Sequence, residues 1–117
     1  MSKPLGPYTP IVRAGDWLVC SGQIGAKDGA LADGIVAQTT QSIANLAALL
    51  ESEGASLNDV VKTTVFLSDI ANWPVMNDPY VAAFGDHRPA RSAFAVRDLP
   101  MGALIEIEAW AYVGSAT

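Results

Sequence analysis

The segment from Leu104 to Val113 constrains the fold most, because its two faces differ in character. Side chains alternate between the faces of a strand. One face is apolar throughout and comprises Ile105, Ile107, Ala109, Ala111 and Val113. The other face mixes carboxylates with large apolar side chains and comprises Leu104, Glu106, Glu108, Trp110 and Tyr112. We expect the apolar face to lie under helices. The mixed face is too apolar for open water and too charged for a core, so we expect it to form an interface with a polar pocket.

The composition also indicates interfaces between subunits. The 117 residues suit a single domain over 1–117, which buries roughly 60–70% of the surface of its unfolded chain. Half of the residues are hydrophobic and only 16% are charged. So small a domain has few places to bury that many apolar side chains, and obligate subunit interfaces are of this apolar kind. A well-filled core without interfaces is the alternative.

The charge and the single cysteine exclude several classes of protein. The formal net charge is −5 and the seven Lys and Arg residues are scattered, whereas nucleic-acid-binding proteins usually carry a basic stripe. We therefore expect no nucleic-acid partner, although local charge in a cleft still allows a small anionic substrate.

Cys20 cannot form an internal disulfide and is expected to be a small buried hydrophobe. No membrane-spanning run and no signal peptide at Met1–Pro4 are visible, so we expect a soluble, cytoplasmic protein without a membrane partner.

The N-terminal part of the chain predicts a strand and a hairpin. A turn-rich segment from Pro4 to Pro10 leads into Asp16–Ile24, where an apolar run predicts a strand that ends at Gly22. The Asp-Gly pair in Lys27-Asp28-Gly29 is typical of a hairpin loop.

Residues 35–53 predict the clearest helix, which ends at Gly54. Its apolar stripe recurs at steps of three and four and comprises Ile35, Thr39, Ile43, Leu46 and Leu50. The polar residues that lie off this stripe comprise Gln38, Gln41, Asn45 and Glu51. Ser56 and Asp59 then resemble a capping turn, and the β-branched run Val60–Leu67 predicts a strand.

A second helix is expected to begin at Asn72, with Asn72 as N-cap and Pro74 in the first turn. Proline inside a helix costs about 3 kcal/mol or more. We therefore expect Pro79 to cause either a break near Asn77 or a fresh helix start there, with the helix running to Phe84.

Two strands close the chain, Arg91–Arg97 and Leu104–Val113, and Leu99–Gly102 joins them. The predicted order is strand, strand, helix, strand, helix, strand, strand. This order favours an α+β fold in which two helices pack on one face of a mixed sheet.

Arg91 and Glu106 are the main candidates for chemistry. In the run Arg88-Pro89-Ala90-Arg91-Ser92, proline stiffens the approach to the strand that carries Arg91. A guanidinium can clamp a planar carboxylate or phosphate through two parallel hydrogen bonds. We expect a small organic acid to bind at Arg91, with Glu106 holding a water or a proton near it. The alternatives are a structural ion pair between Arg91 and Glu106 or Glu108, and a Glu106 that is only a solvated or interface carboxylate.

Other positions allow a structural and a functional interpretation. Gly22, in Ser21-Gly22-Gln23, either ends a strand or lets a ligand approach the backbone. Tyr8 is either a core anchor or a pocket lid with a phenolic donor, and Asn77 is a candidate helix cap. His87 has no Cys, His or carboxylate at ligand spacing, so we expect no metal site. No nucleophile–base pair, P-loop or dinucleotide fingerprint is visible.

An ordered set of short motifs spans nearly the whole chain. It comprises Gly6-Pro7-Tyr8, Ser21-Gly22-Gln23, Gln38-Thr39 with Asn45-Leu46, Asp59 to Leu67, Asn77 with Tyr80, Pro89-Ala90-Arg91-Ser92, Leu99-Pro100, and Ile105 to Ala109. Any one of these motifs is weak, whereas the ordered set is specific. It resembles the Rid family, also called YjgF, which comprises enamine/imine deaminases formerly labelled L-PSP endoribonucleases.

The resemblance implies a homotrimer of chorismate-mutase-like subunits whose sheets form a central barrel, with clefts between neighbouring subunits. By motif match, Arg91 holds the substrate carboxylate, Glu106 positions the attacking water and Tyr8 lines the cleft. Ser21, Gly22 and Asn77 add side-chain and backbone contacts. The implied reaction is hydrolytic deamination of 2-enamino and 2-imino acids, of which 2-aminoacrylate is the archetype, to 2-oxo acids and ammonia. It requires no cofactor, because the imine is already an electrophile. A non-catalytic trimeric module that binds a metabolite is the alternative.

The sequence departs from deaminases close to the archetype at the rim of the implied cleft. Ala93 stands where those members have Cys, Arg88 stands where an aromatic is common, and the loop 85–88 is shorter. If Arg88 points inward, two guanidiniums flank one cleft and the preferred substrate carries a second acidic group. The alternative is a solvated loop arginine.

Overall fold

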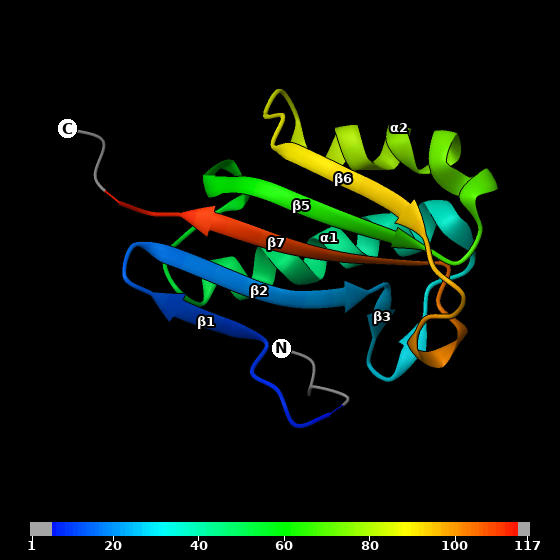
Figure 1. Cartoon of the computed structure of the whole chain (residues 1–117), viewed down its shortest axis with the longest axis horizontal. Helices are drawn as coiled ribbons and strands as arrows, with labels where there is room; N and C mark the ends of the chain where they lie inside the picture. The colour runs from blue at the N-terminus through cyan, green and yellow to red at the C-terminus, as the bar shows by residue number, and fades with distance from the viewer. Residues whose placement is uncertain (1–5, 115–117) are drawn as a thin grey trace.

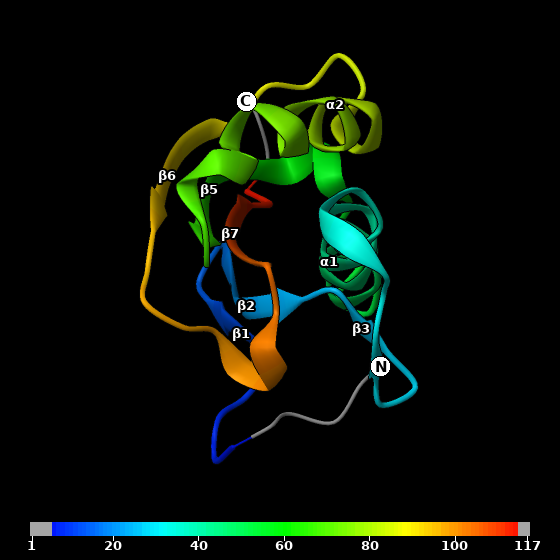
Figure 2. The same ribbon diagram turned by 90° about the vertical axis from the view of Figure 1, so that its right-hand side faces the viewer.

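A five-stranded sheet carries two helices on one of its faces. Figure 1 shows the sheet in front of the helices, and the side view in Figure 2 separates the two layers. The structure is a computed structural model that describes residues 6–114. In chain order its elements are β1 (Ile11–Ala14), β2 (Trp17–Ile24), β3 (Ala26–Lys27), β4 (Ala30–Leu31), α1 (Gly34–Glu51), β5 (Val60–Leu67), α2 (Trp73–Phe84), β6 (Ala90–Ala95) and β7 (Ile105–Tyr112), with 3₁₀ turns at Leu57–Asp59, Ile70–Asn72 and Pro100–Gly102. The predicted α+β architecture is confirmed.

The strand order in the main sheet is β1-β2-β7-β5-β6. β6 pairs with β5 in parallel, and the other neighbours are antiparallel. The sheet is therefore mixed, as predicted. In this order β7 is central and β6 is an edge strand, so β5 separates the strand of Glu106 from the strand of Arg91.

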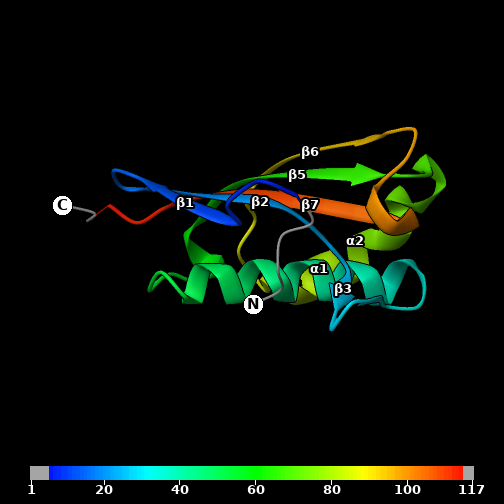
Figure 3. The ribbon, with the colours of Figure 1, turned by 90° about the horizontal axis from the view of Figure 1, so that it is seen from below.

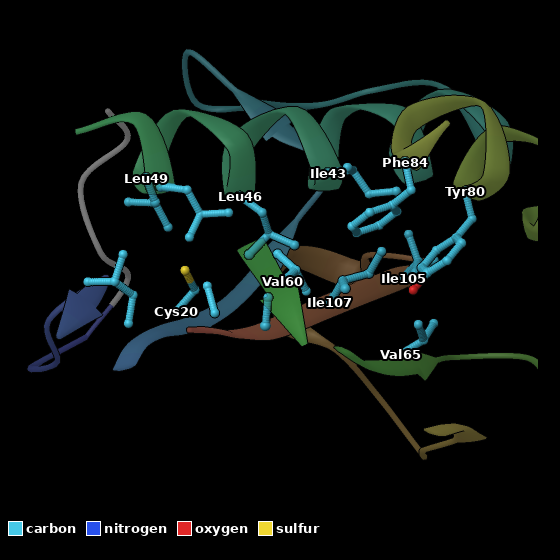
Figure 4. Packing of buried hydrophobic residues seen from close by; sticks show 14 of the residues in the cluster. Cys20, Ile43, Leu46, Leu49, Val60, Val65, Tyr80, Phe84, Ile105 and Ile107 are labelled. Carbon is cyan, nitrogen blue, oxygen red and sulfur yellow. The ribbon is translucent and has the colours of Figure 1, made fainter. Parts of the chain in front are cut away.

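The faces of β7 are as predicted from its alternation. Ile105, Ile107, Ala109 and Ala111 are fully buried under the helices. Figure 3 shows both helices on this side of the sheet, and Figure 4 shows Ile105 and Ile107 packed beneath α1 and α2. The opposite face carries an exposed aromatic cluster in which Trp17 contacts Trp110 and Tyr112 edge to face. The interface expected on this mixed face stays a prediction.

Helix α1 buries the predicted stripe and ends as predicted. Gly54 has a φ of 77°, a conformation that glycine adopts without a steric penalty. The N–H of Ala55 donates to the Leu50 carbonyl at 2.9 Å, and the N–H of Gly54 donates to the Glu51 carbonyl at 3.1 Å. This is the Schellman pattern of a glycine-terminated helix.

Gln38 lies off the apolar stripe, yet it is only 4% exposed. Its Nε2 donates to the Ala32 carbonyl at 3.1 Å, and its Oε1 accepts from the N–H of Leu104 at 2.9 Å. Both ends of the amide therefore have partners, so burial carries little penalty. Gln38 fixes the start of β7 against α1, two residues before Glu106.

The turns before and after α1 confirm two further predictions. Asp28 and Gly29 connect β3 to β4 with φ values of 54° and 82°, the positive pair that a type I′ hairpin needs. Ser56 and Asp59 form a capping box before β5, which spans Val60–Leu67 as predicted.

Two predicted boundaries are wrong. β2 does not end at Gly22 but continues to Ile24, because a register shift between Cys20 and Gln23 in its pairing with β7 accommodates the glycine. α2 runs through Pro79 without a break. Pro79 cannot donate to the carbonyl of Val75, but Val75 is exposed, so water can bind that carbonyl.

The start of α2 and the extent of β6 also differ in detail from the predictions. Asn72 is the N-cap residue, but its side chain makes no capping hydrogen bond. Asp69 instead caps the preceding 3₁₀ turn by accepting from the N–H of Ala71 at 2.9 Å. β6 spans Ala90–Ala95, two residues short of the predicted Arg97.

Cys20 belongs to the core, as predicted. It is 2% exposed, and Figure 4 places it beneath Leu46 and Leu49 of α1. Burial raises the pKa of its thiol to about 11. Such a thiol carries little thiolate at neutral pH and packs as a small apolar group.

No helix within residues 6–114 is long and apolar enough to span a membrane. The turn-rich segment predicted for Pro4–Pro10 lies within the described residues only from Gly6 onward, where Tyr8 donates its N–H to the Gly6 carbonyl at 2.9 Å.

Candidate functional site

A cavity of about 1160 Å³ opens beside Glu106, and we call it the Glu106 cavity. Its walls come from the segment before β1, from β2, the β3–β4 hairpin, α1, the 3₁₀ turn at Pro100–Gly102, and β7. Four of the predicted site residues line it, namely Tyr8, Ser21, Gly22 and Glu106. The structure thus brings together residues that are up to 98 positions apart, as counted from Tyr8 to Glu106.

Glu106 projects from the face of β7 opposite the helices, because its neighbours Ile105 and Ile107 fill the core. It is half-buried, and burial raises the pKa of its carboxyl group above the usual value. The Glu108 carboxylate, on the same face of β7, raises the pKa of Glu106 further. A carboxyl group with a raised pKa is suited to accept and return a proton near neutral pH.

Gly22 lies against the carboxylate of Glu106. A Cβ at position 22 would overlap the Oε2, Cδ and Cγ atoms of Glu106. The space that we expected a ligand to use beside the Gly22 backbone therefore contains the catalytic candidate itself. Only glycine at this position allows the carboxylate to lie across β2.

Ser21 ties the segment that carries Tyr8 to β2. Its Oγ donates to the Thr9 carbonyl at 2.8 Å, and its N–H donates to the Pro10 carbonyl at 2.8 Å. Tyr8 itself is 43% exposed at the rim of the Glu106 cavity, which agrees with a rim position better than with a core anchor. Ser21 holds the rim in place and keeps hydroxyl lone pairs for a ligand.

Arg91 lies on the other side of the sheet. It is paired in register with the buried Thr63 of β5, and its guanidinium contacts α2. The Cζ atom of Arg91 lies 4.9 Å from the centroid of the Tyr80 ring, and Nη1 donates to Met76 Sδ at 3.9 Å. Ala93 packs against the core on the same face as Arg91.

Asn77 lies on α2, next to the Met76 that contacts Arg91, and Arg88 lies in the loop between α2 and β6. The Oδ1 atom of Asn77 is buried and accepts no hydrogen bond from residues 6–114. The guanidinium of Arg88 is exposed, and its Nη1 donates to the Gly85 carbonyl and, at 3.1 Å, to the His87 carbonyl. His87 Nε2 in turn lies 2.6 Å from the Val60 carbonyl, which ties the loop to the start of β5.

Arg91 and Glu106 do not meet within one chain. They project from opposite faces of the sheet, and β5 lies between their strands. The structural ion pair considered for Arg91 is not formed: the ion pairs within residues 6–114 are Arg13–Glu53 and Arg97–Asp98. The predicted site residues therefore form two groups, one around Glu106 and one around Arg91.

Sequence reasoning missed the residues that support Arg91. Tyr80, Thr63 and Met76 all contact Arg91 or its aromatic neighbour, and none was a candidate site residue. Tyr80 and Met76 lie on one face of α2 at i and i+4, a spacing visible in the sequence. The contact with β6 is not visible there, because nothing in the sequence shows that β6 docks beside β5.

Comparisons with known proteins give one family. The family profile described as endoribonuclease L-PSP matches residues 1–113. A RutC family protein from Pyrococcus horikoshii is 47% identical over 113 residues, which cover 94% of this chain and 90% of that protein. A 2-iminobutanoate/2-iminopropanoate deaminase from Salmonella typhimurium is 42% identical over 110 residues, which cover 90% of this chain and 86% of that protein.

The fold agrees with this similarity. The crystal structure of RidA from the Antarctic bacterium Psychrobacter superposes with a TM-score of 0.92 at 38% identity, over 95% of this chain and 92% of that chain.

Proposed function

The chain belongs to the endoribonuclease L-PSP family, also called the YjgF or Rid family, and we propose that it hydrolyses 2-imino and 2-enamino acids to 2-oxo acids and ammonia. The observation that carries this proposal is the pair of groups that a carboxylated imine needs. Glu106, with a raised pKa, lines a cavity. Arg91 forms no ion pair within residues 6–114 and can bind a carboxylate.

In the proposed reaction, Arg91 binds the substrate carboxylate and thereby orients C2. An enamine first takes up a proton at C3 to give the iminium ion. Water then adds to C2 while Glu106 accepts one of its protons, and Glu106 returns that proton to the amino group. The C–N bond breaks, ammonia leaves, and the hydroxyl proton passes through Glu106 to solvent as the 2-oxo group forms. The balance is iminium plus water to 2-oxo acid, ammonia and a proton, with no cofactor.

We further propose that the active protein is a homotrimer with its sites between subunits. Arg91 and Glu106 lie on opposite faces of one chain, so a substrate that contacts both has to lie between two chains. The mixed face with Trp17, Trp110 and Tyr112 is the apolar surface that a barrel of three sheets would cover. Tyr8, Ser21 and Gly22 then come from one subunit, and Asn77 and Arg91 come from its neighbour.

Arg88 is included in the proposed site as a contact for a second acidic group on the substrate. Both Arg88 and Arg91 lower the pKa of Tyr80, against the larger effect of burial, which raises it. Arg91 lies over the Tyr80 ring, and neither guanidinium has a carboxylate partner among the ion pairs of residues 6–114.

We do not extend the family's older name to cleavage of RNA. The net charge is −5, and a basic surface that follows a phosphate backbone is not compatible with seven scattered cations. We place the protein in the cytoplasm, where enzymes that use pyridoxal phosphate release such imines.

The test is to generate 2-aminoacrylate with a dehydratase and to follow the release of pyruvate. We expect the wild-type protein to accelerate this release and Arg91→Ala to reduce kcat/KM by about ten- to a hundredfold, because a charge-assisted contact is lost. Wild-type protein that is no faster than Arg91→Ala would refute the deaminase. Tight calorimetric binding of 2-oxobutanoate without turnover would instead favour the non-catalytic binding module.

A further inference from the structure

The guanidinium of Arg91 lies over an aromatic ring, and no carboxylate of residues 6–114 forms an ion pair with it. Its Cζ lies 4.9 Å from the centroid of Tyr80, and Nη1 makes one long contact to Met76 Sδ at 3.9 Å. A guanidinium over a ring is attracted by the negative face of the π system. Its N–H groups lie in its own plane and stay available to a planar anion. The ring therefore restrains Arg91 without using the donors that bind a carboxylate.

Tyr80 is itself held at both ends. It is 4% exposed, and its hydroxyl forms a 2.7 Å hydrogen bond with Oγ1 of Thr63, which is fully buried. Its ring packs on Phe84 with a centroid distance of 4.8 Å, and Figure 4 shows both side chains pointing from α2 toward the sheet. Buried polar groups with a partner fix orientation, because breaking the bond leaves both groups unsatisfied.

Thr63 connects this ring to the backbone of Arg91. Thr63 on β5 is the register partner of Arg91 on β6. The contacts therefore form a closed path from Arg91 to Tyr80, from Tyr80 to Thr63, and through the strand pairing back to Arg91. A closed path of this kind fixes the position and orientation of the guanidinium relative to the sheet, although Arg91 is on an edge strand.

We propose that Tyr80 is a positioning residue for Arg91: its ring holds the guanidinium in the orientation that receives a carboxylate, and Thr63 fixes the ring. The proposal rests on the proposed function, in which Arg91 binds the substrate carboxylate. Tyr80 then contributes to affinity for the carboxylate and contributes nothing to the chemistry at C2. Burial raises the pKa of the Tyr80 phenol, so the ring is uncharged at neutral pH and replacing it changes no charge.

Four variants separate positioning from packing. Tyr80→Leu removes the ring beneath Arg91. Phe84→Leu removes the adjacent buried ring and serves as the matched control, since no contact between Phe84 and Arg91 is found within residues 6–114. Tyr80→Phe keeps the ring and removes the hydroxyl, and Thr63→Val removes the other half of the same hydrogen bond.

The binding experiment compares 2-oxobutanoate with its uncharged amide by calorimetry. Tyr80→Leu should weaken binding of the carboxylate by about three- to thirtyfold, and Phe84→Leu by less than about twofold. Tyr80→Phe and Thr63→Val should lie between them. The amide should bind equally to all four variants, and Tyr80→Leu should have no effect when added to Arg91→Ala. Equal weakening by the two leucine variants, or an undiminished effect in the Arg91→Ala background, would overturn the proposal.

A second readout does not depend on the proposed function. The Nε–H of Arg91 should give a sharp, ring-current-shifted NMR signal in the wild type and in Phe84→Leu, and that signal should be lost in Tyr80→Leu. Failure of the wild type to bind any 2-oxo acid would refute the proposed function while this signal still reports the ring contact. An Nε–H signal that is unchanged in Tyr80→Leu would overturn the role of Tyr80, whatever the substrate.

Discussion

The Glu106 cavity and the surroundings of Arg91 place opposite charges in very different settings. Glu106 projects from the central strand β7, half-buried beside Gly22 and Glu108, and burial raises its pKa. Arg91 projects from the edge strand β6 and rests on a buried ring. The first setting favours transfer of a proton, and the second favours binding of an anion. One sheet thus carries both groups, but on opposite faces.

The comparison also shows how each group is supported. The position of Glu106 depends on the absence of a side chain at Gly22 and on the start of β7 fixed by Gln38. The position of Arg91 depends on the presence of side chains, Tyr80 and Thr63. Substitutions in the two regions should therefore change different kinetic parameters of the enzyme.

The largest effect should come from Glu106→Gln. We expect kcat to fall by about 10²- to 10⁴-fold with little change in KM, because the group that moves the proton is lost while Arg91 still binds the carboxylate. Glu108→Gln on the same face is the matched control and should keep kcat within about threefold. A rise in KM with unchanged kcat for Glu106→Gln would contradict the division of roles.

Gly22, within β2, and Gly25, directly after it, should respond differently to substitution by alanine. In Gly22→Ala the new Cβ meets the flexible end of Glu106, so we expect a stable protein whose kcat falls by about ten- to a hundredfold. In Gly25→Ala the new Cβ meets the backbone of Gln38 in α1, so we expect a loss of about 1–3 kcal/mol in the free energy of unfolding. Denaturant melts and steady-state kinetics of both variants measure the contrast. If Gly22→Ala lost as much stability as Gly25→Ala, Gly22 would be needed for folding and not specifically for the position of the Glu106 carboxylate.

Arg88→Phe should have a smaller effect that appears only with some substrates. We expect the ratio of kcat/KM for dicarboxylic over monocarboxylic imines to fall by about three- to tenfold, since a second acidic group has to replace the bonds of Arg88 to the Gly85 and His87 carbonyls. Kinetics with paired imines of equal length provide the measurement. The same ratio in the variant and the wild type would leave Arg88 as a loop residue.

The smallest effect should be a shift in pH dependence. In the proposed reaction the ionised form of Glu106 accepts the proton, so kcat/KM should fall as pH decreases through its pKa, and this pKa lies above the usual value. Glu108 contributes to raising it, so Glu108→Gln should move the acid limb of the pH profile to lower pH. A shift to higher pH, or none, would show that the two carboxylates do not interact.

Much of the fold could be predicted because local signals agree with tertiary packing. The alternation in β7, the capping box before β5 and the glycine after α1 each report a local requirement. The continuation of β2 through Gly22 could not be predicted, because the partner strand absorbs the register shift. The continuation of α2 through Pro79 could not be predicted either. The exposed Val75 carbonyl can bind water, and this removes most of the penalty for its missing hydrogen bond.

Candidate site residues could be chosen from the sequence, whereas their arrangement in space could be predicted only in part. The face of Glu106 follows from the period of its strand. The face and neighbours of Arg91 depend on β6 docking parallel to β5, which no local pattern in the sequence encodes. Ser21 illustrates the same limit, because its bonds to Thr9 and Pro10 connect segments whose contact only the fold creates.

If Arg91 and Glu106 act from different chains, as we propose, mixing two inactive variants should restore activity. Arg91→Ala and Glu106→Gln are unfolded together in equal amounts, refolded and assayed. In a cyclic trimer, a site is intact when its Arg91 comes from a Glu106→Gln chain and its Glu106 comes from a neighbouring Arg91→Ala chain. With equal amounts of the two variants, about a quarter of wild-type activity should therefore return. Wild type mixed with the double variant provides the control, with about a quarter expected for sites between chains and about half for sites within one chain. A mixture as inactive as its two parents, with the control at one half, would show that Arg91 and Glu106 do not act from different chains.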